Sequence, residues 1–373
     1  MLKVLKVRIY PNKEQQVVLA QNFGCCRFVW NYYLNKTNTQ YEQTGKGLSY
    51  CDMAKDLTQL KKVKDYAWLK EASSSALQQS LKNLEAAFKN FFEDRARFPK
   101  FKSKHGKKSL RYPASCSLKD KGVKLPKLGI VKAVIPKKID GKIKSVTVTN
   151  TSTGKYYASI LFETKDVPTN KEGKISGIHL GLTNLVTVFD GENCYKVDPM
   201  KTTKRYAKIV RRRQRSLSRK KRGSNNRRKQ VKRVAKYHEK ITNKRQDFLH
   251  KLSRKLVDEN QVIVVKNLCV EGLPHNKFAK SVLDTGFGIL VNFLNYKLDR
   301  EGGKLVEVDR FFPNTRLCNC CKFKNDSLTL KDCEWDCLEC GTHHDRDENA
   351  ARKCDSFSQN REIGGRLAVS SNQ

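Results

Sequence analysis

Two pairs of cysteines near the end of the chain restrict its fold more than any other feature. Cys318 and Cys321 form one Cys-x-x-Cys pair, Cys337 and Cys340 form another, and fifteen residues separate the pairs. Each pair fits a tight knuckle, and four thiolates complete a tetrahedral zinc shell with no open coordination position. The spacing therefore predicts a structural zinc ribbon over 311–343.

The remaining cysteines and the apolar content indicate a reducing compartment. The chain has 13 cysteines, an odd number in a long, lysine-rich sequence, which argues against a disulfide framework. No signal-peptide pattern opens the sequence and no apolar run reaches transmembrane length, so we expect a cytoplasmic protein without membrane contact. Cys320 and Cys333 lie off the zinc spacing and are not expected to be ligands. The others are expected to be small buried hydrophobes: Cys25, Cys26, Cys51, Cys116, Cys194, Cys269 and Cys354.

Net charge restricts the partners of this chain. Its 76 lysines and arginines outnumber 37 acidic residues, giving a formal charge of +39 over 373 residues. This excess favours a polyanion as the partner. It is concentrated between 199 and 238, where there are eighteen basic residues and no acidic one. Such side chains on two helices would repel one another without phosphates, whose neutralisation releases counterions and gives strong, salt-sensitive binding.

Two basic segments are the expected nucleic-acid contacts. A loop over 98–104, Phe-Pro-Lys-Phe-Lys-Ser-Lys, suits a phosphate backbone and has Lys100, Lys102 and Lys104 after Pro99. Neither segment by itself chooses between DNA and RNA. The contacts expected in the helical hairpin are Arg211, Arg212, Arg213, Arg219, Lys220, Lys221, Arg222, Arg227, Arg228, Lys229, Lys232 and Arg233.

Hydrophobic periodicity changes twice along the first half of the chain. Residues 1–10 alternate as a strand, and 13–95 have apolar residues at helical spacing. Between 120 and 166 the period returns to two, which predicts antiparallel strands that could close a small barrel with 1–10. The segment 167–173 is typical of a linker.

The second half has a different order of elements. Three strands follow 174, then a helical hairpin over about 200–257 that is interrupted near Gly223. A buried strand at 261–265, a helix near 279–299 and a strand at 304–308 come next. Three strands followed by alternating helices and strands predict a ribonuclease-H-like α/β domain.

The zinc pattern runs directly into the segment DRDENAA (345–351), and this combination resembles the end of the TnpB family. That family comprises transposon-encoded RNA-guided nucleases related to type V CRISPR effectors. Other landmarks fall in the family's order across nearly the whole chain: YPNKEQ, FGCCRFVWN, FPKFKSK, GIHLGLTNLVTV, the basic hairpin ending in DFLHKLSRKLV, and PNTRLC.

The resemblance implies a multidomain α+β protein with a helical recognition lobe, a small β-barrel wedge domain and a RuvC-like domain with a zinc-ribbon insertion. It also implies a guide RNA and a double-stranded DNA target as partners, with a monomer on one guide in a bacterial nucleoid. The reader of a short DNA motif would lie near Tyr32, Tyr33 and Asn35, or in 99–108. The implied boundaries are wedge 1–10 and 121–168, recognition lobe 11–120, RuvC-like domain 174–310 and 344–356, ribbon 311–343, and disordered tail 357–373.

Two of three expected carboxylates are replaced. A RuvC-like nuclease holds two Mg²⁺ ions with acids from separate strands and a helix. In the family's patterns, the first acid's place is taken by His179 in Gly-Ile-His-Leu-Gly, and the second by Lys266 after a buried strand. Asp347 keeps the third place. The charge of this set is zero instead of −3, so Lys266 would repel a divalent cation and could pair with Asp347.

The departures imply a subgroup, the TnpB-like nuclease-dead repressors (TldR), which silence genes by occupying a guided target. We therefore expect structural zinc and guide RNA but no Mg²⁺ and no enzyme activity. Three alternatives stay open. The first is an active nuclease with a shifted metal site, using Asp345, Glu271 or Asp190, or His179 with a soft metal. The others are a guide-free nucleic-acid-binding protein and a zinc-ribbon transcription factor that reads bases directly.

Overall fold

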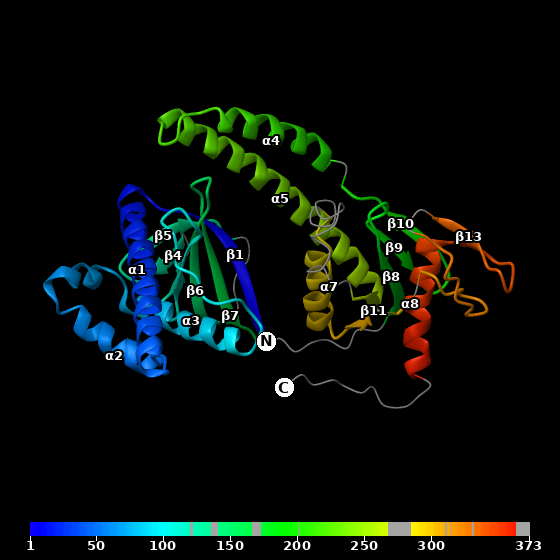
Figure 1. The fold of residues 1–373 in the computed structure, drawn as a ribbon, viewed down its shortest axis with the longest axis horizontal. Helices are drawn as coiled ribbons and strands as arrows, with labels where there is room; N and C mark the ends of the chain where they lie inside the picture. Colours follow the sequence, from blue (N-terminus) through cyan, green and yellow to red (C-terminus); the bar gives the residue numbers. More distant parts are fainter. Residues whose placement is uncertain are drawn as a thin grey trace. The chain divides into compact units, whose positions relative to one another are not determined.

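The chain divides into two compact units, Met1–Asp166 and Val167–Gln373, which are described here one at a time (Figure 1). The structure is a computed structural model. It describes residues 1–119, 122–135, 141–165, 173–200, 202–267, 285–309, 312–313, 315–329 and 332–362.

The first unit contains one seven-stranded antiparallel sheet. Its hydrogen-bonded order is β2-β6-β7-β1-β5-β4-β3, so the first strand of the chain lies in the middle and pairs with β7 and β5. The strands that the sequence predicted to form a barrel with 1–10 thus join in a single sheet. Its strands are β1 (Leu2–Tyr10), β2 (Lys108–Tyr112), β3 (Ser117–Lys119), β4 (Gly122–Leu125), β5 (Gly129–Ala133), β6 (Lys142–Asn150) and β7 (Tyr156–Glu163).

Helices cover this sheet and share its core. The helices are α1 (Lys13–Thr44), α2 (Tyr50–Leu60), the 3-10 helix η1 (Lys64–Glu71) and α3 (Ser74–Phe92). Asn12 begins α1 with a capping box, because its side chain accepts from the amide of Gln15 while the Gln15 side chain accepts from the Asn12 amide. Two strands, β2 and β3, lie within 11–120, so the segment assigned to a helical lobe also supplies both edge strands of the sheet.

The second unit is built on a five-stranded mixed sheet. Its strands are β8 (Lys174–Leu180), β9 (Val186–Phe189), β10 (Cys194–Val197), β11 (Asn260–Lys266) and β12 (Lys304–Val308), in the order β10-β9-β8-β11-β12. The first three strands form an antiparallel meander, and β11 and β12 add to β8 in parallel. Along the chain, three strands are followed by helices and strands in alternation, which is the order of elements that the sequence predicted for a ribonuclease-H-like domain.

Helices pack on both faces of this sheet. On one face, Ile178 and Val265 share a core with α5 (Asn225–Glu259) and α7 (Phe287–Glu301). On the other face, Val264 packs with Cys354 of α8 (Arg346–Glu362). The contact is closest at Gly177, where a Cβ atom would come within 2.1 Å of the carbonyl oxygen of Ala351. Only a glycine allows α8 to lie against the middle of β8 in this way.

Three further elements complete the second unit. α4 (Thr202–Ser218) forms the predicted hairpin with α5, and a small antiparallel pair, β13 (Glu334–Asp336) with β14 (His343–Asp345), precedes α8. The helix α8 continues to Glu362, so the part of the expected disordered tail up to that residue is helical. The rest of that tail lies outside the described residues. Among the described helices, none is both long and apolar enough to cross a membrane.

Candidate nucleic-acid interface and candidate metal sites

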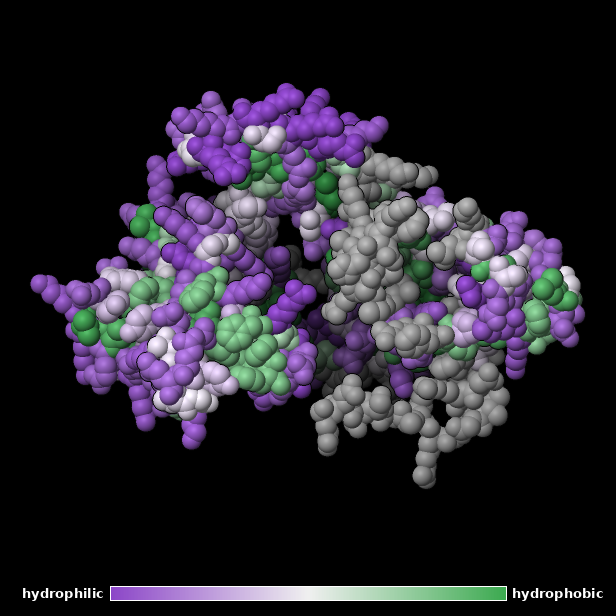
Figure 2. Space-filling view, in the orientation of Figure 1, coloured by the Kyte–Doolittle hydropathy of each residue, from purple (hydrophilic) through white to green (hydrophobic). Residues whose placement is uncertain are grey.

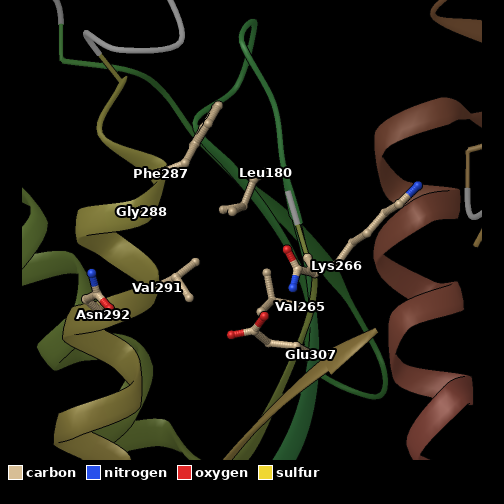
Figure 3. A pocket seen from close by; sticks show the side chains of 9 residues that line it. Leu180, Val265, Lys266, Phe287, Gly288, Val291, Asn292 and Glu307 are labelled. Atoms are coloured by element: carbon tan, nitrogen blue, oxygen red, sulfur yellow. The ribbon is translucent and has the colours of Figure 1, made fainter. Parts of the chain in front are cut away.

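The three positions expected for carboxylates meet on the α8 face of the second sheet. Val265 pairs with Ile178 in the parallel β8–β11 register, which makes Lys266 and His179 neighbours at the carboxyl ends of these strands. Since Ile178 and Val265 point into the opposite core, alternation turns His179 and Lys266 toward α8. Figure 3 shows Lys266 extending toward α8, away from Val291 and the other α7 residues that line a cavity on the opposite face.

His179 and Asp347 come into contact across this face. The Nε2 atom of His179 lies 3.5 Å from Oδ1 of Asp347, and the guanidinium of Arg346 lies 3.7 Å from the same oxygen. Burial lowers the pKa of His179, and this effect outweighs the attraction of Asp347, which raises it. The imidazole is therefore neutral at pH 7, so the negative charge of Asp347 is not offset by an imidazolium.

The ammonium of Lys266 bonds to a backbone carbonyl outside the contact between His179 and Asp347. Its ammonium donates to the carbonyl oxygen of Phe312 at 2.7 Å, and burial lowers its pKa. This differs from the expected ion pair with Asp347, whose carboxylate contacts His179 and Arg346. The lysine still adds a cationic group to the site and lowers the pKa of His179.

The carboxylates that could substitute for the missing acids already have structural roles. Asp345 caps α8, because its Oδ1 atom accepts from the amides of Asp347 and Glu348 at 3.0 Å each. Its other oxygen accepts from Lys196 at 2.7 Å. Burial acts to raise the pKa of Asp345, but the bonds from Lys196 and the amides keep it below its ordinary value.

Asp190 is similarly engaged in a turn. Its carboxylate accepts from the amides of Glu192 at 3.1 Å and Asn193 at 2.7 Å, and these bonds lower its pKa. Glu271, the third candidate, lies outside the described residues. Both described carboxylates, Asp345 and Asp190, are thus already engaged in hydrogen bonds that fix local turns.

The four predicted cysteines come together in one cluster. The Sγ atoms of Cys318, Cys321, Cys337 and Cys340 all lie within 4.8 Å of one another. The two knuckles are closed by backbone hydrogen bonds from Lys322 to Cys318 and from Gly341 to Cys337. This arrangement could hold a zinc ion in a closed four-sulfur shell. Cys320 and Cys333 are exposed and lie outside the cluster, as the spacing predicted.

Two side chains that the sequence did not single out connect the cysteine cluster to α8. The Nε2 atom of His344 lies 3.1 Å from the Cys318 sulfur, and the ring of Trp335 packs against this imidazole. Asn349 is 1 % exposed, and its amide accepts from the backbone of Asn319 and donates to the carbonyl of Leu317. The first knuckle is thereby fixed to the helix that contains Asp347.

The basic hairpin presents its charges to solvent along α4 and α5 (Figure 2). Val210 and Val234 are buried, which leaves the arginines and lysines outside. Arg227 is an exception, because its guanidinium donates to the carbonyl of Leu217 at 2.9 Å and so caps the end of α4. Of the predicted contacts, these are exposed: Arg211, Arg212, Arg219, Lys221, Arg222, Arg228, Lys229, Lys232 and Arg233; Arg213, Lys220 and Arg227 are half-buried.

In the first unit, the basic loop is tied to α1. The indole of Trp30 donates to the carbonyl of Lys100 at 3.0 Å, and the Asn31 amide exchanges two hydrogen bonds with the backbone of Lys102. The Lys102 ammonium lies 3.4 Å from the centroid of the Trp30 ring. Lys104 lies on the same loop and is exposed. The tethers hold these lysines at a fixed place on the surface.

A polar hollow lies beside this loop, between α1, α3 and β2. Gln79 and Asn83 of α3 line it, joined by a hydrogen bond of 2.9 Å, together with Lys102 and Lys104. Tyr33, by contrast, is fully buried and its hydroxyl donates to Asp56, so its side chain belongs to the core, as the helical spacing of apolar residues in 13–95 indicates.

A ribonuclease-H-like α/β sheet with a four-cysteine cluster before its last helix defines a class of nuclease-related proteins. The chain belongs to the TnpB family. Three family models match it: one described as "Probable transposase" (OrfB of the IS605 type) over 159–277, a helix-turn-helix domain over 1–46 and a Cas12f1-like TNB domain over 287–354. In the structure, 1–46 contains one strand and the single helix α1.

Relatives of similar length are known. A "Putative RNA-guided DNA endonuclease" of Streptomyces pristinaespiralis is 37% identical over 94% of this chain and 88% of its own length. The E. coli K12 protein named "Putative RNA-guided DNA endonuclease InsQ" is 33% identical over 86% of this chain and 83% of its own length. Among solved structures, Cas12f1 in a complex with sgRNA and target DNA has a TM-score of 0.58 at 14% identity, covering 95% of this chain and 98% of that one. This last similarity supports the fold.

Proposed function

We propose that this protein binds DNA at a site specified by a guide RNA, does not cut it, and lowers transcription by occupying it. The relatives named as RNA-guided DNA endonucleases support the guide, and the fold shared with Cas12f1 supports RNA and DNA as the two partners. Base pairing would then read the target sequence while the protein holds the heteroduplex backbone.

The single observation that carries the loss of cleavage is the meeting of His179, Lys266 and Asp347 at the strand ends. Their charges at pH 7 are zero, +1 and −1, so the position has no net charge to balance two divalent cations. Mg²⁺ prefers oxygen ligands, and only Asp347 supplies them among the three. Asp345 and Asp190 are already bonded to backbone amides, which argues against a shifted metal site.

Zinc in this proposal has a structural role. The four clustered sulfurs match the donor set and number that Zn²⁺ prefers, and a closed shell leaves no position for water or substrate. The ion would fix the two knuckles, and Asn349 would transmit that rigidity to α8.

Two surfaces would hold the nucleic acids. The exposed arginines and lysines of the α4–α5 hairpin suit the phosphate backbone of either strand. The hollow between α1, α3 and β2 suits the DNA motif, because the side-chain amides of Gln79 and Asn83 can pair with adenine edges while Lys104 contacts phosphate. The proposed motif reader is thus α3 together with the segment 99–108, which is one of the two places that the resemblance implies.

The test begins with expressing the protein together with its flanking DNA and sequencing the RNA that co-purifies. One abundant RNA with a constant scaffold and a short variable end is expected, and that end identifies a target. The purified complex should bind this target, leave it intact in Mg²⁺ or Mn²⁺, and repress a reporter that contains it. A smear of cellular RNA would favour a guide-free binder, and Mg²⁺-dependent cutting would establish an active nuclease.

A further inference from the structure

A group of phenylalanines lies on the surface where α3 ends. Phe88 and Phe91 contact Phe98 of the following loop edge-on, with ring centroids 5.7 and 5.2 Å apart, and Phe91 contacts Phe92 at 5.4 Å. Phe88 also packs against the core of the first unit. Figure 2 shows hydrophobic residues gathered over this part of α3 with hydrophilic residues around them.

Two of these rings face water. Phe92 is 70 % exposed and Phe98 is 44 % exposed. They are nevertheless held in place, since Phe92 is the last residue of α3 and Phe98 precedes the buried Pro99 and the loop tethered by Trp30. Fixed aromatic rings that stay exposed on a surface are suited to a flat partner that stacks on them.

The charge around the rings selects that partner. Between 89 and 108 there are eight lysines and arginines and two acidic residues, and one of these, Glu93, contacts both Lys89 and Arg95. Arg97 and Lys100 flank Phe98 and are exposed. An apolar protein surface would not need so many cations, whereas single-stranded nucleic acid presents unpaired bases and phosphates together.

We propose that Phe92 and Phe98 form a stacking platform for unpaired bases of a single-stranded nucleic acid, with Arg97 and Lys100 contacting its phosphates. This inference rests on the proposed function, which supplies two such strands: unpaired parts of the guide RNA and the DNA strand displaced by it. Stacking on an aromatic ring tolerates any base, so the platform would hold a strand without reading its sequence.

The experiment uses the full chain in two preparations, one stripped of RNA for titration and one with its co-expressed RNA for crosslinking. Phe92→Ala and Phe98→Ala are compared with Phe92→Trp, which keeps a stacking surface, and with Tyr41→Ala, a 56 % exposed aromatic residue of α1, as the matched control. RNA-free protein is titrated with single-stranded oligo(dT) and oligo(U). We expect each alanine variant to bind roughly tenfold more weakly, and Phe92→Trp and Tyr41→Ala to bind like the wild type.

Crosslinking then separates the two strands. Photo-crosslinking with 5-iodouridine in the guide, or 5-iodo-deoxyuridine in the displaced DNA strand, followed by mass spectrometry, should recover peptides containing Phe92 or Phe98 from one of them. The platform is overturned if Phe92→Ala and Tyr41→Ala bind the oligonucleotides equally well. It is also overturned if Phe92→Ala abolishes self-association of the protein and leaves its binding to single strands unchanged. The proposed function fails on a different result, which is that no discrete RNA co-purifies with the wild type. The oligonucleotide titration can still be interpreted in that case, because it uses RNA-free protein.

Discussion

The imidazole of His179 lies 3.5 Å from the carboxylate of Asp347, and these two side chains are 15 % and 14 % exposed. A histidine thus occupies the space beside the single acid that remains of the expected set. Its neutral ring leaves Asp347 without a second carboxylate neighbour from β8, and Lys266 adds a positive charge from β11. Three predictions concern this site and its supports, a fourth the basic hairpin and a fifth the tethered loop.

Restoring both acids should restore cutting. His179→Asp with Lys266→Glu returns the site to three carboxylates on an unchanged backbone, and we expect Mg²⁺-dependent cleavage of the guided target to rise from background to a readily detected product. Each single variant should stay inactive, because one replacement still leaves an incomplete charge set. Gel analysis of target DNA measures this, and adding Asp347→Ala to the double variant is the control that should abolish it.

Zinc should depend on the four clustered cysteines only. Cys337→Ser should lower the zinc content from one ion per chain to well below one, and a large part of the folding free energy of the ribbon should be lost with it. Cys320→Ser, an exposed cysteine outside the cluster, is the matched control and should keep full zinc. Elemental analysis of purified protein decides between these outcomes.

Removing the Asn349 amide should loosen the ribbon from α8. Asn349→Ala leaves the Leu317 carbonyl and the Asn319 amide without this partner in a buried place, which should cost about 1–3 kcal/mol of unfolding free energy. Chemical denaturation measures the loss. Asn35→Ala, at an exposed position of α1, should change stability little; equal effects of the two variants would contradict the role of Asn349.

Neutralising the exposed hairpin should change how binding responds to salt. Arg212→Ala and Arg219→Ala should each lower the slope of log K against log salt by about 0.7–0.9 if each contacts one phosphate. Lys251→Ala, which removes a charge further along α5 that is paired with Asp247, is the control. Arg227→Ala should instead destabilise the hairpin, because it removes the cap on α4. Fluorescence anisotropy over a range of salt concentrations, with melting curves, separates the two effects.

Lys102 should make binding and stability depend on pH. Burial lowers its pKa from 10.5 to about 8, so above pH 8 the folded protein loses this charge while the unfolded chain retains it. Folding stability should therefore gain from this group as the pH rises from 8 to 10.5, while affinity for nucleic acid falls in the same window. Lys102→Arg, which stays charged, should remove the pH-dependent fall in affinity. If the affinity of Lys102→Arg falls with pH just as that of the wild type does, Lys102 does not contact the nucleic acid.

Much of the second unit could be predicted from its sequence, because each of the strands β8 to β12 and each helix of the hairpin has its own local pattern of apolar residues. The cysteine cluster was predictable for the same reason, since ligand spacing is a local property. The roles of Asn349 and Arg227 were not, because each depends on a partner from another helix or from a knuckle of the ribbon. The tether from Trp30 to Lys100 spans seventy positions and leaves no periodic signal.

The parallel register of β8 and β11 has a consequence for how such a protein changes over time. Positions 179 and 266 stand at strand ends whose backbone bonds and core-facing neighbours, Ile178 and Val265, do not involve their side chains. Two substitutions there alter chemistry while the ladder, the glycine contact at α8 and the binding surfaces persist. If the proposed function holds, cutting and holding are separable properties of one scaffold, and a lineage can exchange the first without rebuilding the second.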